Sequence, residues 1–195
     1  MSLVPVEASF FGQSTVALAQ SLIGMLLVKE TEQGIAAGWI VETEAYTGVA
    51  DQAAHSFGNR RTARTEIMYH EPGHVYTYTM HTHCLVNIVC EPVGVAEAVL
   101  IRAVEPHIGL SLMQERRGLD KSLHQLTNGP GKLTKALGIT MNDYGNHATK
   151  RPLFIAVGRQ VEEISIGPRI GIPNSGAARH YPYRFWETGN PFVSK

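Results

Sequence analysis

The sequence has few cysteines, no long apolar run and no excess of charge of either sign. Two cysteines among 195 residues are too few for a disulfide scaffold, so a reduced, cytoplasmic protein is expected. No stretch approaches the roughly 18 apolar residues that a transmembrane helix requires, and the first residues do not resemble a signal peptide. The formal net charge is zero, which argues against bulk electrostatic binding of nucleic acid but leaves room for local basic clusters.

Several catalytic and metal-binding motifs are also absent. The sequence contains no HExxH segment, no P-loop and no Gly-x-Ser-x-Gly segment. It also lacks the Cys-x-x-Cys pair of the zinc deaminases. His70, His74, His81 and His83 lie close together in the sequence, next to Cys84. A metal-dependent hydrolase built on these histidines is kept as an alternative, but no metal is expected.

The chain contains no linker, repeat or low-complexity stretch, so one domain over residues 1–195 is expected. Hydrophobic periodicity and turn residues predict short helices, hairpins of strands and one long ordered loop over residues 47–71. The tail from residue 179 is expected to be irregular. The predicted helices span residues 14–24, 109–117 and 132–137, and the predicted strands span 25–30, 35–46, 74–80, 83–89, 96–106, 153–157 and 163–168.

Two carboxylates and a ring stand at the end of the strand predicted over residues 35–46. Glu42, Glu44 and Tyr46 alternate, and alternate side chains of an extended strand share one face. His55 follows nine residues after Tyr46. Two interpretations stay open. The carboxylates are either solvated where the strand reaches water, or they are acid–base groups beside the rings, because clustered carboxylates mark function only in some proteins.

A basic residue lies inside the apolar strand predicted over residues 96–106. Arg102 follows Leu100-Ile101, and a buried guanidinium needs a partner because an unpaired buried charge is costly. Glu44 and Glu105 are the candidate partners. Arg102 can be a structural ion-pair residue or a group that orients a glutamate and a water, and the two roles are compatible.

Aromatic and basic residues indicate a second kind of contact. Tyr76 and Tyr78 alternate along one strand and, with Tyr46 and His55, could line two sides of a slot for a flat base, although tyrosines also favour strands for structural reasons. Lys132 follows a glycine-containing turn at a predicted helix start, where backbone amides bind phosphate oxygens. Scattered arginines ordinarily form a solvated surface; they are Arg60, Arg61, Arg64, Arg169, Arg179 and Arg184.

Eight segments distributed over nearly the whole chain carry a family resemblance. They are Ile40–Tyr46, Ala53–Ser56, Pro72-Gly73 with Tyr76 and Tyr78, Asn87-Ile88, Leu100–Pro106, Gly129–Leu133, Arg169–Ile172 and Gly189–Ser194. In this order they resemble the methylpurine-type 3-methyladenine (alkyladenine) DNA glycosylases, and the set is far more specific than any single motif. The resemblance implies an α+β fold, a compact domain with a curved, mostly antiparallel sheet, short flanking helices and a protruding β-hairpin.

The resemblance implies a function and its catalytic residues. The expected reaction is hydrolysis of the N-glycosidic bond of a flipped-out alkylated or deaminated purine, of the 3-methyladenine, 7-methylguanine, hypoxanthine and ethenoadenine class, without a lyase step. Glu44 is implied as the general base that activates the attacking water. Arg102 and the backbone carbonyl of Ile170 are implied to hold that water. A binding module that recognises damaged DNA without catalysis is the alternative.

The resemblance also implies binding residues and partners. Tyr46, His55 and Tyr78 would line the slot for the flipped base, and Asn87 would stand at its wall and exclude a base with an exocyclic 2-amino group. The expected partner is double-stranded DNA that contains a damaged purine; no membrane, cofactor or metal is expected, and the protein is expected to be a monomer. The phosphate contacts would come from Arg60, Lys132 and Arg169.

The tip of the second hairpin departs from the family pattern. In the vertebrate relatives a tyrosine at this tip fills the gap left by the extruded nucleotide. Here the segment between Tyr78 and Asn87 is one residue shorter and has Met80-His81 at that place. Apolar wedges such as methionine can intercalate and histidine can stack, so Met80 and His81 are expected to act as a pair.

Overall fold

The computed structural model describes residues 3–194, which form one eight-stranded sheet, three α-helices and seven short 3₁₀ turns. The helices are α1 (Thr15–Ser21), α2 (Leu110–Arg117) and α3 (Pro130–Leu137). The strands are β1 (Leu26–Thr31), β2 (Gly34–Tyr46), β3 (Val75–Met80), β4 (His83–Cys90), β5 (Glu97–Ile108), β6 (Leu153–Ala156), β7 (Ile164–Gly167) and β8 (Arg184–Glu187).

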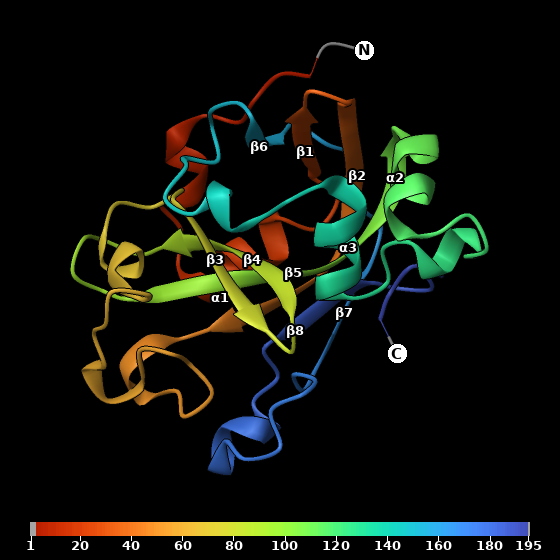
Figure 1. Ribbon diagram of the computed structural model, residues 1–195. Coiled ribbons are helices and arrows are strands. Elements are labelled where there is room, and N and C mark those ends of the chain that lie inside the picture. The colour runs from red at the N-terminus through yellow and green to blue at the C-terminus, as the bar shows by residue number, and fades with distance from the viewer. Residues whose placement is uncertain (1–2, 195) are drawn as a thin grey trace.

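The sheet follows the order β3-β4-β5-β2-β1-β6, and β8 pairs with both β2 and β7. Every pairing is antiparallel. Figure 1 shows that the sheet is strongly curved and that the β3–β4 hairpin projects from it. The expected α+β fold with a curved antiparallel sheet, short helices and a protruding hairpin is therefore confirmed. None of the described helices is long and apolar enough to cross a membrane.

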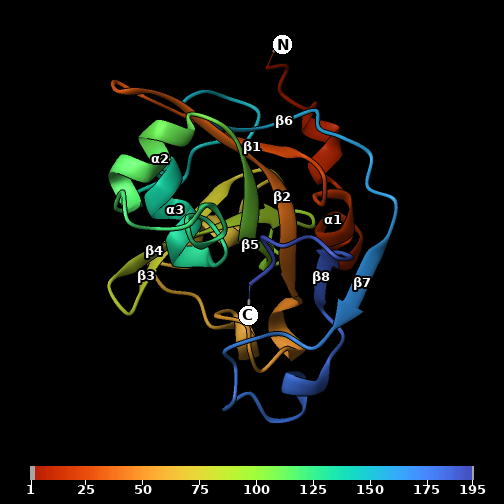
Figure 2. The same cartoon turned by 90° about the vertical axis from the view of Figure 1, so that its right-hand side faces the viewer.

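The helices cover the sheet from two sides. Figure 2 shows α2 and α3 on one side of β2 and β5, and α1 on the other. α3 begins at Pro130, whose fixed φ suits a first helical position, and ends at Gly138, which adopts the left-handed conformation. Its Leu133, Ala136 and Leu137 are buried in the main hydrophobic core. α3 therefore begins two residues earlier than predicted, at the proline.

β2 is the strand that positions the candidate site. Its first half pairs with β1, and its second half lies between β5 and β8. The pairing of β2 with β5 is irregular around Glu42, where the register passes from Ile40↔Val104 to Thr43↔Ile101. Such bulges re-aim side chains, and here the irregularity includes Arg102 of β5.

The tail is more regular than the sequence suggested. Residues Arg184–Glu187 form β8 instead of an irregular segment, and they pair with Glu42–Glu44 of β2. A four-residue strand with only Phe185 buried gives no clear alternating pattern. The prediction for this segment was wrong because the pairing of β8 is set by distant strands and not by its own sequence.

Two long loops and the hairpin gather near the end of β2. The loop over residues 47–74 contains three 3₁₀ turns, as expected for an ordered loop. In both ribbon views it lies at the same end of the sheet as the loop over residues 168–183. The β3–β4 hairpin contacts α3 closely, because a Cβ at Gly131 would lie 2.6 Å from the Cβ of His83. The space between these loops, the hairpin and α3 holds the candidate site.

Candidate active site

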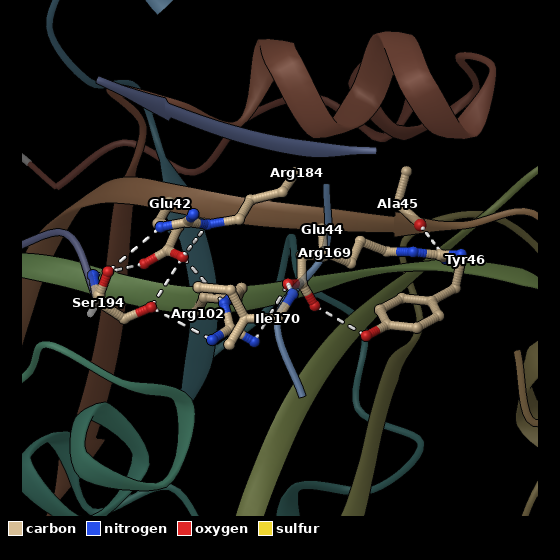
Figure 3. Close-up of polar contacts among 9 residues, drawn as sticks. All are labelled: Glu42, Glu44, Ala45, Tyr46, Arg102, Arg169, Ile170, Arg184 and Ser194. Carbon is tan, nitrogen blue, oxygen red and sulfur yellow. Dashed lines mark hydrogen bonds and ion pairs between the residues drawn. The ribbon is translucent and has the colours of Figure 1, made fainter. Parts of the chain in front are cut away.

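The two glutamates of β2 are fully buried. Glu42 and Glu44 are each 0% exposed, so the interpretation of carboxylates solvated at a strand end is wrong. Their side chains project from the same face of β2 with that of Tyr46, as the alternation predicted (Figure 3). A buried charge is tolerated only where it is paired and hydrogen-bonded, and both carboxylates meet that condition.

Glu44 is held by three groups that come from different elements. Its Oε1 accepts a hydrogen bond of 2.7 Å from the backbone N–H of Ile170 and lies 3.3 Å from the Nη1 of Arg102. Its Oε2 accepts a 2.8 Å hydrogen bond from the hydroxyl of Tyr46. The amide of Ile170 thus contacts Glu44 directly, whereas the role implied for its carbonyl stays a prediction.

Arg102 forms the expected ion pair, but its main partner is a residue that was not predicted. Its Nε donates to Oε1 of Glu42 at 2.9 Å, a shorter contact than the one to Glu44. The prediction of Glu105 as an alternative partner is wrong, because the Glu105 carboxylate binds Arg159 at 2.6 Å. Glu42 also accepts hydrogen bonds from Arg184 and Ser194, so Arg102 is part of a larger buried network.

The environment of Glu44 perturbs its ionisation. Burial raises the pKa of Glu44, and the nearby Arg102, the Ile170 amide and the Tyr46 hydroxyl lower it, but burial prevails. The Tyr46 phenol has a pKa raised well above its ordinary value, first by burial and then by the Glu44 charge, so it remains a hydrogen-bond donor. A buried carboxylate with a raised pKa is a candidate general base.

A pocket bounded by aromatic rings lies beside Glu44. This ring pocket has a volume of about 80 Å³, and its lining includes Tyr46, His55, Tyr76, Tyr78 and Asn87, with Met80 and Ile172. The structure therefore brings together the four residues that the resemblance implied for base binding, and also Tyr76, which the strand pattern had suggested as a further ring of the slot. The rings of Tyr76 and Tyr78 are nearly parallel, with centroids 5.5 Å apart, and the His55 ring meets Tyr78 edge-on at 4.6 Å.

The polar groups of the ring pocket are neutral at neutral pH. Burial, Arg64 and Arg60 lower the pKa of His55 to about 4, and its Nδ1 lies 2.8 Å from the Tyr76 hydroxyl. Burial raises the pKa of Tyr78 to about 12. Asn87 donates through its amide nitrogen to the backbone carbonyl of Tyr76 at 3.0 Å, which fixes its orientation in the wall. An uncharged, ring-lined pocket of this kind suits a flat heterocycle.

A larger cavity adjoins the ring pocket. This outer cavity has a volume of about 420 Å³ and shares Tyr46, Tyr78, Met80 and Ile172 with the ring pocket. Its remaining lining combines the hairpin tip, the start of α3 and two contacts of Glu44, and includes His81, His83, Arg102, Gly129, Lys132 and Ile170. Glu44 lies behind this wall, because three groups that contact it, Tyr46, Arg102 and Ile170, all line the outer cavity.

The residues expected to contact phosphates differ in their availability. Lys132 is exposed at the outer cavity, where its Nζ donates to Asn128 at 2.8 Å. Arg60 is exposed on the long loop, outside both cavities. Arg169 does not fit the expectation, because its side chain is 0% exposed and forms two hydrogen bonds with Asp51. Its guanidinium instead lies over the Tyr46 ring, 4.6 Å from the centroid.

Over residues 3–194, the structure contains no group of three or more histidine, cysteine or acidic side chains that could hold a metal. Sequence reasoning missed two residues of the buried network, Arg184 and Ser194. Both lie more than 140 positions from Glu42, at separations of 142 and 152 residues. No local pattern links residues so far apart; the only available signal was that Ser194 closes one of the segments shared with a known family.

Comparisons with known proteins show the family of the chain. The family described as Methylpurine-DNA glycosylase (MPG) matches residues 9–191. A protein of Bacillus licheniformis is 62% identical over 191 residues, which cover 98% of this chain and 97% of the relative, and one of Bacillus subtilis (strain 168) is 61% identical over the same lengths. A Listeria monocytogenes protein (serotype 4b) is 44% identical over 196 residues, covering 100% of this chain and 94% of the relative. Each is named "Putative 3-methyladenine DNA glycosylase". The chain therefore belongs to the methylpurine-DNA glycosylase family.

Proposed function

We propose that this protein is a monofunctional 3-methyladenine DNA glycosylase of base-excision repair. It takes up a damaged purine that has rotated out of the duplex and hydrolyses the bond that joins the base to deoxyribose. Its substrates are alkylated or deaminated purines of the 3-methyladenine, 7-methylguanine, hypoxanthine and ethenoadenine class. The names of the relatives support the reaction class, whereas the range of lesions rests on the chemistry of the pocket.

One observation is central to the proposal. Glu44 is a buried carboxylate, fixed by the Ile170 amide, the Tyr46 hydroxyl and Arg102. All three of these residues line the outer cavity, and Tyr46 also lines the ring pocket. An enzyme cannot reach the glycosidic bond of a base stacked in a duplex, so the nucleotide must be extruded. The ring pocket would receive the flat base, and the outer cavity would hold the sugar and its flanking phosphates.

The ring pocket can favour damaged bases over normal ones. A purine alkylated at N3 or N7 is cationic, and a cation is attracted to the faces of tyrosine rings by about 0.5–2 kcal/mol. Tyr76, Tyr78 and Tyr46 offer such rings, while His55 is neutral and does not repel a cation. A damaged base also unstacks at lower cost. Selection therefore combines easier extrusion with stacking on electron-rich rings.

The chemical step follows from the position of Glu44. The C1′–N bond of the nucleotide breaks, the base leaves with the bonding electrons, and the sugar develops oxocarbenium character. The ionised Glu44 stabilises this charge and accepts a proton from a water, whose oxygen bonds to C1′. A cationic base departs as a neutral molecule and needs no acid. A neutral lesion such as hypoxanthine must be protonated, with solvent as the source of the proton, as its bond to C1′ breaks. No amine attacks the sugar, so neither a Schiff base nor strand cleavage is expected.

The hairpin tip is the proposed wedge. Met80 is 39% exposed, and the next residues, His81 and Thr82, both have positive φ angles of 45° and 70°. Such angles are unfavourable for residues with side chains, so this tip sequence is not explained by the stability of its turn. Met80 and His81 line the outer cavity and would fill the gap left by the extruded nucleotide.

The test is Glu44→Gln, assayed by release of free 3-methyladenine from methylated duplex DNA. The amide keeps the shape of the side chain and one accepting oxygen but cannot take a proton, so release should fall by at least about 100-fold, with lesion binding retained. Glu162→Gln, which removes an exposed carboxylate outside both cavities, is the matched control and should remain active. Excision by Glu44→Gln at the wild-type rate would refute the proposed role.

The same assay separates the alternatives. If the wild-type protein binds lesion DNA but releases no base, it is a binding module. Loss of release in excess EDTA would favour a metal-dependent hydrolase. A protein–DNA adduct trapped by borohydride would show a Schiff base and contradict the monofunctional reaction. The expected monomeric state and cytoplasmic location stay predictions.

A further inference from the structure

Ser194 and Glu42 close a network of hydrogen bonds behind Arg102 (Figure 3). The backbone N–H of Ser194 donates to Oε2 of Glu42 at 2.7 Å, and its hydroxyl donates to Oε1 at 2.8 Å. The Nη2 of Arg102 donates to the same hydroxyl at 3.2 Å. Arg184 of β8 adds a 2.6 Å hydrogen bond to Oε1 of Glu42. Glu42 and Ser194 line neither cavity, whereas Arg102, which they contact, lines the outer cavity.

Stability alone gives no reason for this network. Buried ion pairs recover little more than their desolvation cost, and apolar residues of similar volume often serve as well or better. Here two carboxylates and two guanidinium groups lie together, and Glu42 is fully buried. What the network does define is the orientation of Arg102, since a guanidinium held at Nε and Nη2 has only its Nη1 left to face Glu44.

The distances indicate how the charge of Arg102 is shared. Its Nε is 2.9 Å from Glu42, whereas its Nη1 is 3.3 Å from Glu44. A carboxylate in a tight bidentate pair with arginine is a strongly stabilised anion and therefore a weak base. Because Glu42 takes the closer contact, Arg102 remains beside Glu44 without fully neutralising it.

We propose that Glu42 and Ser194 are positioning residues, which hold Arg102 at the orientation and distance that let Glu44 act as the base. This inference rests on the proposed function of Glu44. If it is correct, the excision rate also depends on Ser194 and on β8, although neither lines the ring pocket or the outer cavity.

The charged and titratable groups that face Glu44 set the expected pH response. They are Arg102 of β5, Glu42 and Tyr46 of β2, Tyr78 of β3, and Arg169, which lies directly before Ile170 in the loop between β7 and β8. Among them, the Glu42 charge raises the pKa of Glu44 and Arg102 lowers it. Replacing Glu42 by a neutral amide removes the first influence and frees Arg102 to approach Glu44, so both changes lower the pKa of Glu44.

The experiment measures single-turnover release of 3-methyladenine from methylated duplex DNA as a function of pH. Ser194→Ala should lower the plateau rate about tenfold, equivalent to about 1.4 kcal/mol, with unchanged affinity for lesion DNA. The acid limb of the profile, where the rate falls as the pH is lowered, should not move, because the charges of Glu42 and Arg102 remain. Ser194→Thr keeps the hydroxyl and should restore the rate. Glu42→Gln should lower the plateau and also move the acid limb to lower pH.

Two control variants separate positioning from stability. Ser165→Ala removes an exposed hydroxyl that binds Thr188, and Glu105→Gln weakens the ion pair with Arg159; neither residue touches Arg102. Both should excise at the wild-type rate. If Ser194→Ala is folded and as fast as Ser165→Ala, or if Ser194→Thr is as slow as Ser194→Ala, the inference is wrong. A wild-type protein that releases no base, or an active Glu44→Gln, would instead overturn the proposed function itself.

Discussion

Two buried carboxylate–arginine pairs contact Tyr46, and they differ in how closely the carboxylate is paired with its arginine. In the Asp51–Arg169 pair, Oδ2 and Oδ1 of Asp51 accept hydrogen bonds of 2.5 and 2.8 Å from the guanidinium, and the backbone N–H groups of Thr47 and Ala53 donate to the same carboxylate. In the Glu44–Arg102 pair, the nearest contact is 3.3 Å. Only the second pair adjoins a cavity, through Arg102.

The difference separates a scaffold from a reactive group. Both oxygens of the Asp51 carboxylate are paired with Arg169 and with backbone N–H groups, although the buried Nε of Arg169 has no hydrogen-bond partner. Arg169 adds hydrogen bonds to the carbonyls of Ala45 and Ala178, so the pair ties two long loops to the end of β2. Glu44 keeps a raised pKa because its partners compensate its burial only in part. A carboxylate with unused capacity to accept hydrogen bonds can still take a proton, and a saturated one cannot do so without breaking the structure.

The largest effect is expected from the Asp51–Arg169 pair. Asp51→Ala leaves the Arg169 guanidinium buried without a partner and should lower the free energy of unfolding by about 3–5 kcal/mol. Urea unfolding followed by circular dichroism measures this loss. Glu66→Ala, which removes an exposed ion pair with Arg61, is the control and should cost far less stability, because solvent screens an exposed ion pair. If Asp51→Ala costs no more than Glu66→Ala, the pair is not a scaffold and the comparison fails.

A smaller effect, on rate instead of stability, is expected from the hydroxyl that links Tyr46 to Glu44. Tyr46→Phe keeps the ring over Arg169 but removes the 2.8 Å hydrogen bond, which lowers the pKa of Glu44. The pKa of Glu44 should therefore rise further, and activity should be lost at a higher pH as the solution is acidified. Excision on the plateau should fall by about tenfold.

The pH–rate profile of single-turnover excision tests this prediction for Tyr46→Phe. Since Glu44 acts as an anion, its activity is present above its pKa and is lost as the pH falls through it. Tyr181→Phe removes a hydroxyl outside both cavities and should leave the profile unchanged. An acid limb that stays in place or moves to lower pH in Tyr46→Phe would show that the hydroxyl does not stabilise the anion.

The same contrast explains how much could be predicted from the sequence. The common face of Glu42, Glu44 and Tyr46 follows from the two-residue period of a strand, which is a local property. The burial of Arg102 and its need for a carboxylate were also readable from its apolar neighbours. The sequence could not show which carboxylate pairs with Arg102, because Glu105 is bound by Arg159, which approaches from a distant loop.

Residues far apart in the sequence define the rest of the site. Arg169 was expected at the surface, where most arginines lie, and it is buried because Asp51, 118 positions away, offers a matching carboxylate. Arg184 reaches Glu42 because β8 pairs with β2, and the sequence of a four-residue strand does not predict this pairing. Sequence patterns and the family resemblance indicated the groups that are proposed to carry out the chemistry, whereas the groups that hold them in place depend on tertiary contacts.

The smallest effect concerns His55. Among the residues that line the ring pocket, it is the one expected to change charge in mildly acidic solution. The pKa of His55 is lowered to about 4 from an ordinary value of about 6.5, because burial, Arg64 and Arg60 disfavour its charged form. Between these values the unfolded chain binds a proton that the folded protein does not, so stability falls as the pH drops from about 6.5 towards 4. Partial exposure reduces the loss to the order of 1 kcal/mol.

Thermal unfolding of His55→Gln across this pH range isolates the contribution of that proton. The variant should lose less stability on acidification than the wild-type protein, because glutamine does not titrate. His107→Gln, which replaces an exposed histidine stacked on Trp39, should keep the wild-type dependence. If His55→Gln and wild type lose stability in parallel, His55 is not held neutral by its surroundings. The ring pocket would then present a positive charge to a cationic base in mildly acidic solution, and the preference for alkylated purines would have to come from the ease of extrusion and not from the rings.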